Sequence, residues 1–417
     1  MFWRRYSLSG MRRRELVLTT ALLLCAPVVL SVPAHAQTYS VIHNFTGDDG
    51  RNPEAGLTLN GTSSLFGGAA NVVFILRQTG TGWTLLPIYE FNSMDGSGVQ
   101  GRLTIGPDGA LYGASGFGGS GYGFIFMMRP PTAQCMAPPC YWTETLLYEF
   151  EDSDGYEPTG GLIFDSAGNI YGTTQAGGLF HSGLVFMLSP SQGGWTETIL
   201  HNFHYFLDGD HPNGNLVMDR SGNIIGTASY GGVGLGYTLP GGGVVFELTP
   251  TSSGWVESTL HVFTGKRDGD TPGAGLIPDA AGNLYGVTQN GGANGGGTVY
   301  ELTPTNGSYA FQVLYNFTGT IDQVGPYGLL AIDSSGSLYG VTITEGAFGE
   351  GNIFKLTPNG GQWVYTDLHD FSGGADGGTP LGGVTLDPSG NLYGTTNLGG
   401  SDDCGGGCGV IWEVTPQ

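Results

Sequence analysis

Apolar and aromatic residues recur along the chain in three short patterns. The first is a hydrophobic residue, an aromatic residue and a glycine, and one of its seven copies lacks the aromatic ring. The second ends in Phe, with Trp or Tyr eight residues earlier in six of seven copies. The third closes a short apolar run with Thr-Pro. The glycines of the first pattern, 46 to 60 residues apart, are Gly67, Gly113, Gly172, Gly226, Gly286, Gly340 and Gly394. This spacing predicts a repeat architecture of seven units.

Each unit contains four strand-like segments. In the third unit they are residues 161–164, 169–174, 183–188 and 195–203. Residues 165–169, Asp-Ser-Ala-Gly-Asn, join the first two as a hairpin turn in which Gly168 supplies a positive φ. Thr-Pro ends the third strand in several units, because Pro cannot continue a ladder of hydrogen bonds. No segment after residue 36 shows helical periodicity, so the chain is predicted to be all-β.

Short, evenly spaced strands with periodic Gly and aromatic positions are typical of a β-propeller. We predict seven blades of four antiparallel strands; the alternative, a β-solenoid, has coils shorter than these units. The chain after residue 36 opens with the Phe-ended strand, residues 38–45, and stops after the Thr-Pro strand, residues 409–416. The last blade therefore lacks its fourth strand, and pairing with the N-terminal strand closes the ring and hides both edges. Residues 37–417 are predicted to be this single domain.

One stretch of the last unit identifies a family. Residues 387–396, Asp-Pro-Ser-Gly-Asn-Leu-Tyr-Gly-Thr-Thr, are followed by Gly399-Gly400 and a Val/Ile–aromatic strand, and the other six units carry counterparts. The pattern resembles the Gloeo/Verruco (GloVer) extracellular tandem repeat of secreted bacterial proteins over nearly all of residues 38–416. The resemblance implies export and a repeat architecture, and it carries no activity over to this chain. Because Gln417 directly follows the last strand, without a sorting segment, we expect free secretion.

The N-terminus agrees with export. Residues 1–36 are predicted to be a cleaved signal peptide, since basic residues between Arg4 and Arg14 precede the apolar run 16–32, and residues 34–36 are Ala-His-Ala. The apolar run is short and contains Pro27, which argues against a membrane anchor. We expect the protein outside the cell, with the periplasm as the alternative, and without a membrane contact after cleavage.

Composition excludes some partners. The 417 residues hold 78 Gly, and 13 Lys and Arg face 35 Asp and Glu, for a net charge of -22. Nucleic acid and anionic membrane surfaces both require clustered basic residues, so neither is an expected partner. Hydrophobic residues, at 39%, suffice for a core, which excludes a disordered low-complexity chain.

Four cysteines after residue 36 form two local pairs, Cys135 with Cys140 and Cys404 with Cys408. In an exported protein such pairs predict two small disulfide loops. A shared zinc site is the alternative, but neither pair has the C-x-x-C spacing and no His is nearby.

An acidic turn stands between consecutive units, on the face where propellers usually bind ligands. Carboxylates gathered near one face could coordinate Ca²⁺, which takes six to eight oxygen ligands. We favour the interpretation that each Asp caps its own turn through backbone N–H groups. No cofactor is predicted with certainty, and Ca²⁺ is the one candidate. The carboxylates are those of Asp49, Asp95, Asp154, Asp208, Asp268, Asp322 and Asp376.

His and Tyr alternate at the position two residues before the Phe of the second pattern. A position that accepts either residue favours a flat ring with a polar tip, and therefore packing rather than metal binding. The recurrent Trp residues are interpreted in the same way, as filler between blades. The residues concerned are His43, Tyr89, Tyr148, His201, His261, Tyr315 and His369.

Residues that break the repeat are the better candidates for a ligand site. His204, Asp210 and His211 stand in one loop between units, where they could hold a metal or form an acid–base pair. Lys266 and Arg267, rare cations in an acidic protein, stand in the next such loop and could bind a carboxylate. The alternative for both groups is a solvated polar loop.

No sequence motif of a catalytic site is present: there is no G-x-S-x-G, H-E-x-x-H or dinucleotide-binding fingerprint. Our leading hypothesis is a secreted, monomeric, non-enzymatic propeller that binds an extracellular carbohydrate or protein. A hydrolase or lyase acting on polysaccharide is the second hypothesis, and a structural envelope or matrix protein is the third.

Overall fold

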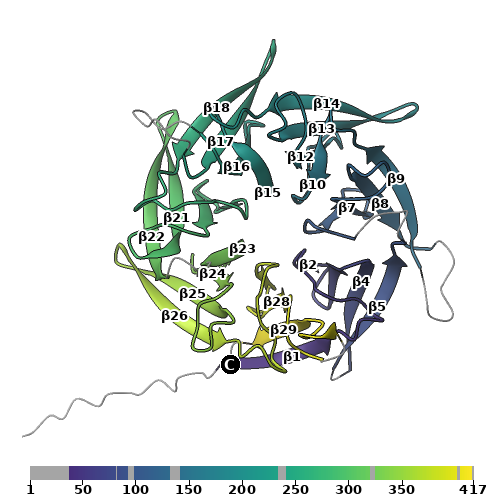
Figure 1. Cartoon of the computed structure of the whole chain (residues 1–417), viewed down its shortest axis with the longest axis vertical. Coiled ribbons are helices and arrows are strands. Elements are labelled where there is room, and N and C mark those ends of the chain that lie inside the picture. The colour runs from purple at the N-terminus through teal and green to yellow at the C-terminus, as the bar shows by residue number, and fades with distance from the viewer. Residues whose placement is uncertain are drawn as a thin grey trace, which may run out of the picture. The chain divides into compact units, whose positions relative to one another are not determined.

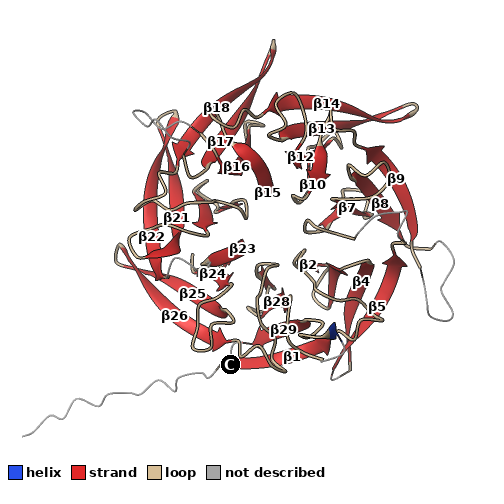
Figure 2. Ribbon diagram, in the orientation of Figure 1, coloured by secondary structure: helices blue, strands red, loops and turns tan. Residues whose placement is uncertain are grey.

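The computed structural model describes residues 37–80, 82–92, 98–131, 141–232, 241–319, 325–401 and 404–415. These residues form seven antiparallel sheets arranged around a central axis as the blades of a propeller (Figure 1). Consecutive blades follow one another around the ring, and Figure 2 shows strands in every blade. The predicted all-β fold of seven blades is confirmed.

In each blade the first strand lies nearest the axis and the last strand lies at the periphery (Figure 1). The first four blades comprise β2 (Thr58–Leu59), β3 (Ser64–Ala69), β4 (Val72–Thr79) and β5 (Gly82–Glu90); β6 (Thr104–Ile105), β7 (Leu111–Ser115), β8 (Phe124–Arg129) and β9 (Thr143–Glu149); β10 (Tyr156–Pro158), β11 (Ile163–Phe164), β12 (Ile170–Ala176), β13 (Leu184–Ser191) and β14 (Gly194–Asn202); and β15 (Asp210–Met218), β16 (Ile224–Tyr230), β17 (Val244–Thr251) and β18 (Gly254–Val262). In the third blade the innermost strand is divided, because β10 and β11 both pair with β12.

The remaining blades repeat the same order of strands. They comprise β19 (Ile277–Pro278), β20 (Leu284–Thr288), β21 (Gly295–Thr305) and β22 (Ser308–Thr318); β23 (Pro326–Ile332), β24 (Leu338–Thr342), β25 (Asn352–Asn359) and β26 (Gln362–Asp370); and β27 (Thr385–Leu386), β28 (Leu392–Thr396), β29 (Val410–Thr415) and β1 (Thr38–Asn44).

The N-terminal strand closes the ring. Strand β1 runs antiparallel to β29, with Thr38 opposite Thr415 and Asn44 opposite Val410, and it supplies the outer strand of the seventh blade. This pairing was predicted from the order of the patterns at the two ends of the domain. The facing edges of β1 and β29 are hydrogen-bonded to each other. Neither edge is therefore open to pair with a second chain.

Close packing explains the glycine of the first repeated pattern. A Cβ on Gly172 would lie 2.5 Å from the ring of Phe186, its partner on the neighbouring strand β13. A Cβ on Gly394 would lie 2.2 Å from the ring of Trp412 on β29. Each blade therefore pairs this glycine with a large buried ring, and the ring fills the space that a side chain would take.

The tyrosine of the same pattern is tied to the hairpin turn that precedes it. Asp165 accepts hydrogen bonds from the backbone N–H groups of Ala167 and Asn169 and from the Tyr171 hydroxyl. These bonds hold the pKa of Asp165 below its ordinary value against the opposing effect of burial. The carboxylates of Asp279, Asp333 and Asp387 accept the equivalent bonds in later blades.

The recurrent Trp side chains lie between blades, as the sequence predicts. Trp142 on the second blade meets Phe66 of the first edge to face, with ring centroids 5.5 Å apart. Trp83 of the first blade meets Tyr393 of the seventh in the same way at 5.6 Å. Each blade is thus packed on its predecessor, and the seam that closes the ring is built like the others.

Of the two predicted disulfides, one is present: Cys404 and Cys408 are bonded. Cys135 and Cys140 lie outside the described residues. Among the described residues, no helix is long and apolar enough to cross a membrane.

Candidate binding site in the axial channel

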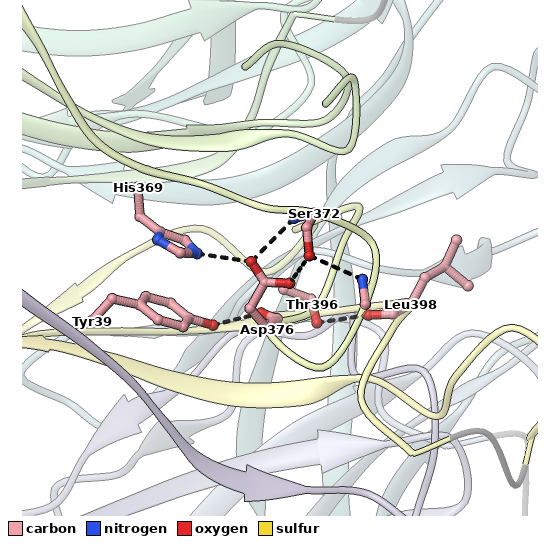
Figure 3. A network of polar contacts seen from close by, with 7 residues as sticks. Tyr39, His369, Ser372, Asp376, Thr396 and Leu398 are labelled. Carbon is pink, nitrogen blue, oxygen red and sulfur yellow. Dashed lines mark hydrogen bonds and ion pairs between the residues drawn. The ribbon is translucent and has the colours of Figure 1, made fainter. Parts of the chain in front are cut away.

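The acidic turns between blades are closed by their own backbone. Asp49 accepts a hydrogen bond from the Thr46 N–H at 2.8 Å, and Asp376 accepts one from the Ser372 N–H at 3.1 Å (Figure 3). The carboxylates of Asp154, Asp208 and Asp268 accept the equivalent bonds. Asp95 and Asp322 lie outside the described residues. The turn geometry therefore accounts for the recurrence of Asp.

The second role of these carboxylates explains the alternation of His and Tyr. His43 donates from Nε2 to Asp49 at 2.9 Å, and Tyr148 donates its hydroxyl to Asp154 at 2.7 Å. Figure 3 shows the same contact between His369 and Asp376, at 3.2 Å. Either side chain offers a donor at the tip of a flat ring, so either satisfies the carboxylate. Burial lowers the pKa of His43 and His369, and the neighbouring Asp opposes that effect.

The alternative hypothesis for these turns is a calcium site. Among the residues that the structure describes, no three or more His, Cys, Asp or Glu side chains form a group that could hold a metal ion. Each described acidic turn lies at a different junction between blades, and its Asp is hydrogen-bonded within its own turn. The described carboxylates are therefore not gathered into a calcium site.

The five residues that break the repeat are dispersed. Among these residues, Asp210 and His211 are in contact: Oδ2 and Nδ1 lie 2.7 Å apart, and this contact raises the pKa of His211. The ring of His204 instead packs edge to face against Phe180, with centroids 4.8 Å apart. Lys266 and Arg267 are exposed at the tip of the following loop. This set does not define one site.

A different set of residues converges on the axis. In each unit, the residue that follows the loop proline, or the residue aligned with it, lines one cavity of about 190 Å³ at the centre of the ring. We call these seven the rim residues: Glu54, Gln100, Thr159, Asn213, Gly273, Tyr327 and Leu381. One equivalent position in the seven units thus places seven different residues around one space.

An uncommon backbone conformation turns the chain into this cavity. In five units the residue before the loop proline has a positive φ although it is not glycine: Asn52, Glu157, His211, Thr271 and Thr379, with φ between 48° and 61°. This conformation is costly for residues with a Cβ, and it persists where the surrounding structure imposes it. Here it marks the corner at which each interblade loop becomes an innermost strand.

The walls between the rim residues are backbone. The residue after each rim residue is Gly or Ala in all seven units, because neighbouring innermost strands converge there. A Cβ on Gly160 would lie 2.5 Å from the Gly214 carbonyl oxygen, and one on Gly101 would lie 2.5 Å from the Gly160 carbonyl oxygen. Side-chain chemistry in the cavity is therefore concentrated in the rim residues and in a few residues below them.

One charged side chain lies below the rim. Arg102 lines the central cavity and also a second cavity of about 430 Å³ on its far side, so it lies between the two. Its Nη2 donates to the Val384 carbonyl at 3.2 Å and to the Thr385 hydroxyl at 3.0 Å, both on the seventh blade. Burial lowers the pKa of Arg102 to about 10, at which the guanidinium stays protonated at neutral pH.

The rim itself carries one acid and one phenol. Burial raises the pKa of Glu54, and burial together with the negative charge of Glu54 raises the pKa of Tyr327. The Thr159 hydroxyl is buried and has no hydrogen-bond partner among the described residues. The cavity therefore offers amides, hydroxyls, one carboxylate and one guanidinium to a bound molecule.

The rim residues could not be singled out as residues that interrupt the repeat. Each rim residue is an ordinary member of its unit, and none forms a motif with its neighbours in the chain. A signal was nevertheless present. Five units contain Asp-Gly-x-x-Pro, and the second and sixth align with it although they carry Val99 in place of Pro and Gln323 in place of Gly; the residue at the next position differs in all seven units, whereas the one after it is always Gly or Ala.

Comparison with known proteins gives a family and a fold. The model of a family described as the Gloeobacter/Verrucomicrobia repeat matches residues 135–281 and 236–417. No curated protein has a matching sequence.

Solved structures with a similar fold are distant in sequence. The extracellular domain of a proposed one-component system from Bacteroides thetaiotaomicron is 10% identical, with a TM-score of 0.52 over 90% of this chain and 40% of that chain. A proposed 6-phosphogluconolactonase from Bacteroides uniformis is 14% identical, with a TM-score of 0.49 over 82% of this chain and 89% of that chain. The PQQ-bound aldose sugar dehydrogenase of Streptomyces coelicolor is 12% identical, with a TM-score of 0.42 over 92% and 100%. At these identities the likeness concerns the propeller fold alone.

Proposed function

Because the chain belongs to the Gloeobacter/Verrucomicrobia repeat family, whose model covers more than half of it, we propose that it is an exported, non-enzymatic binding protein whose ligand is a carbohydrate held in the axial channel. The observation that carries this proposal is the set of rim residues. The seven units place a different residue at this position in every blade, and all seven of these residues line the same cavity.

The chemistry of the rim favours a sugar. Gln100 and Asn213 each offer a carbonyl acceptor and an N–H donor, and Tyr327 offers a hydroxyl on a flat ring. Sugars present hydroxyl groups, which both donate and accept, on a ring whose faces are less polar than its edge. The cavity, at about 190 Å³, is smaller than the roughly 300–1,000 Å³ of pockets for drug-sized ligands. It therefore fits one sugar residue, such as the end of a chain.

The same residues argue for binding rather than hydrolysis. Most glycoside hydrolases use two carboxyl groups that flank the scissile bond. Among the described residues that line the central cavity, Glu54 is the one carboxylic acid. Export is part of the proposal and rests on residues 1–36; the mass of the mature protein recovered from the culture medium is expected to correspond to a chain that begins at Gln37.

Calorimetric titration of the purified protein with a panel of monosaccharides and short oligosaccharides tests the proposal. We expect at least one to bind, and the Gln100→Ala and Asn213→Ala variants to bind it at least tenfold more weakly. The matched control is Gln362→Ala, because Gln362 is an exposed residue of β26 far from the axis. Binding that is unchanged in the two channel variants, or no binding to any sugar, would contradict the proposed site.

A further inference from the structure

The central cavity contains a cation that the fold does not neutralise. Eight Lys and Arg residues follow residue 36. Arg102 is half-buried and lines the central cavity, whereas six of the other seven are exposed. The residues aligned with Arg102 in the other units carry no charge: Gly56, Gly161, Asn215, Gly275, Leu329 and Gly383. One blade alone therefore places a positive charge beneath the rim.

The charge of Arg102 has neutral partners. Among the described residues, its hydrogen bonds go from Nη2 to the Val384 carbonyl and the Thr385 hydroxyl, and no carboxylate forms an ion pair with it. A guanidinium has five N–H donors, so Nε and Nη1 have donors left over. A half-buried charge without a counter-charge costs free energy, and a charged hydrogen bond to an anion would offset that cost.

Arg102 is part of the wall of a space that a ligand can occupy. Arg102 lines the cavity together with Gln100 of the same blade and Asn215 of the fourth blade. The Asn215 side chain lies across from it against the third blade, where a Cβ on Gly161 would be 2.4 Å from Oδ1. A group that binds in the central cavity therefore shares it with the side chain of Arg102.

We infer that the sugar residue bound in the axial channel carries an oxyanion, a carboxylate or a sulfate ester, which Arg102 binds through its free N–H donors. The inference rests on the proposed function, because it assigns the chemical class of the ligand of the same cavity. The planar fork of a guanidinium matches the two oxygens of a carboxylate or the oxygens of a sulfate, and it gives little advantage to a neutral hexose.

The rim carboxylate sets the orientation of such a ligand. Glu54 lines the same cavity as Arg102, and its carboxylate repels an oxyanion. The ligand therefore enters with its oxyanion toward Arg102 and its hydroxyl groups toward Glu54. Replacing Glu54 with Gln removes the repulsion and keeps a hydrogen-bonding group of the same size.

Titration calorimetry with matched pairs of sugars tests the inference. The probes are glucuronate, galacturonate and mannuronate, each against its neutral hexose, and glucose 6-sulfate against glucose. We expect the protein to bind one charged sugar at least tenfold more tightly than its neutral partner. Preference for a uronate identifies a carboxylate, and preference for glucose 6-sulfate identifies a sulfate ester. Arg102→Met is expected to abolish the preference, Arg102→Lys to keep part of it, and Glu54→Gln to strengthen it.

The outcomes separate the two proposals. Equal affinity for both members of every pair, or a preference that survives Arg102→Met, would overturn the assignment of an anionic sugar and leave a sugar-binding channel in place. No binding to any probe would overturn the proposed function as well. Because Arg102 also contacts the seventh blade, the thermal unfolding of each variant is recorded, and the selectivity of the wild-type protein decides the question if Arg102→Met does not fold.

Discussion

Replacing Glu197 with Gln should stabilise this protein above neutral pH, and the reason lies between two blades. Glu197 on β14 faces the second blade, where the Tyr148 hydroxyl lies 3.5 Å from it and 2.7 Å from Asp154. A phenol has one proton to donate, and the closer carboxylate receives it. Oε1 of Glu197 is buried and has no hydrogen-bond partner among the described residues. Burial, and next the negative charge of Asp154, raises the pKa of Glu197 to about 7.

The size and sign of the effect follow from proton linkage. The pKa of this glutamate is 4.5 in the unfolded chain and about 7 in the native state. Between these values the native state holds more protons, so stability falls as the pH rises from 4.5 to 7 and is constant beyond. Each pKa unit corresponds to about 1.4 kcal/mol, which sets an upper limit of about 3 kcal/mol. Glu197 is partly exposed, and solvent screening reduces the expected loss to about 1–2 kcal/mol.

Urea unfolding followed by Trp fluorescence, at a series of pH values from 4.5 to 8, measures the difference between wild type and variant. We expect the free energy of unfolding of Glu197→Gln, relative to that of the wild type, to rise by about 1–2 kcal/mol as the pH increases across this range. The reason is that the amide of Gln has no charge to desolvate. The control is Glu151→Gln, which removes the same charge from an exposed loop residue. A difference that stays constant with pH, or one that grows in favour of Glu at high pH, would refute the reasoning.

Three further changes test the architecture. Asp165→Ala leaves two backbone N–H groups of the hairpin turn and the Tyr171 hydroxyl without their acceptor, and urea unfolding should show a loss of about 1–3 kcal/mol; an unchanged midpoint would contradict the role given to this turn. Cys404→Ser opens a disulfide with a sequence separation of 4, for which loop entropy gives about 2 kcal/mol; the variant should unfold at a lower temperature, and the oxidised wild type should lose the same amount on reduction. Tyr39→Ala removes a stacked contact with a centroid distance of 3.7 Å and a hydrogen bond of 2.6 Å at the closing seam, and should cost about 3 kcal/mol. Size-exclusion chromatography should then detect association through the exposed edge of β29, and a monomer with unchanged stability would argue against closure by β1.

The repeated positions could be predicted from the sequence, because each of them satisfies a local requirement in every unit. Gly172 must admit the ring of Phe186, and Asp165 must cap its turn, so both leave a periodic trace. The partner of His43 could not be predicted in the same way. The sequence shows that His and Tyr alternate at its position, but only the folded turn brings Asp49 to the tip of the ring.

The central cavity could not be predicted from the sequence, because its residues lie far apart in the chain. Glu54 and Tyr327 are more than 250 residues apart in the chain, and they share a space only because seven blades close into a ring. Nothing near Arg102 in the sequence distinguishes it from an exposed arginine on a strand. Its place in the cavity wall depends on the folded ring, in which its Nη2 donates to Val384 and Thr385 of the seventh blade.

The arrangement of constant and varied positions explains how a repeat can become selective. Seven identical rim residues would give the cavity a rotational symmetry, and a ligand without that symmetry could bind in several equivalent orientations. In this chain the rim runs through an acid, two amides, a hydroxyl, a glycine, a phenol and an apolar side chain. The single guanidinium beneath it belongs to the second blade alone. The scaffold is therefore held by residues that must repeat, whereas the rim residues differ from blade to blade, and under the proposed function these differences select the ligand and its orientation.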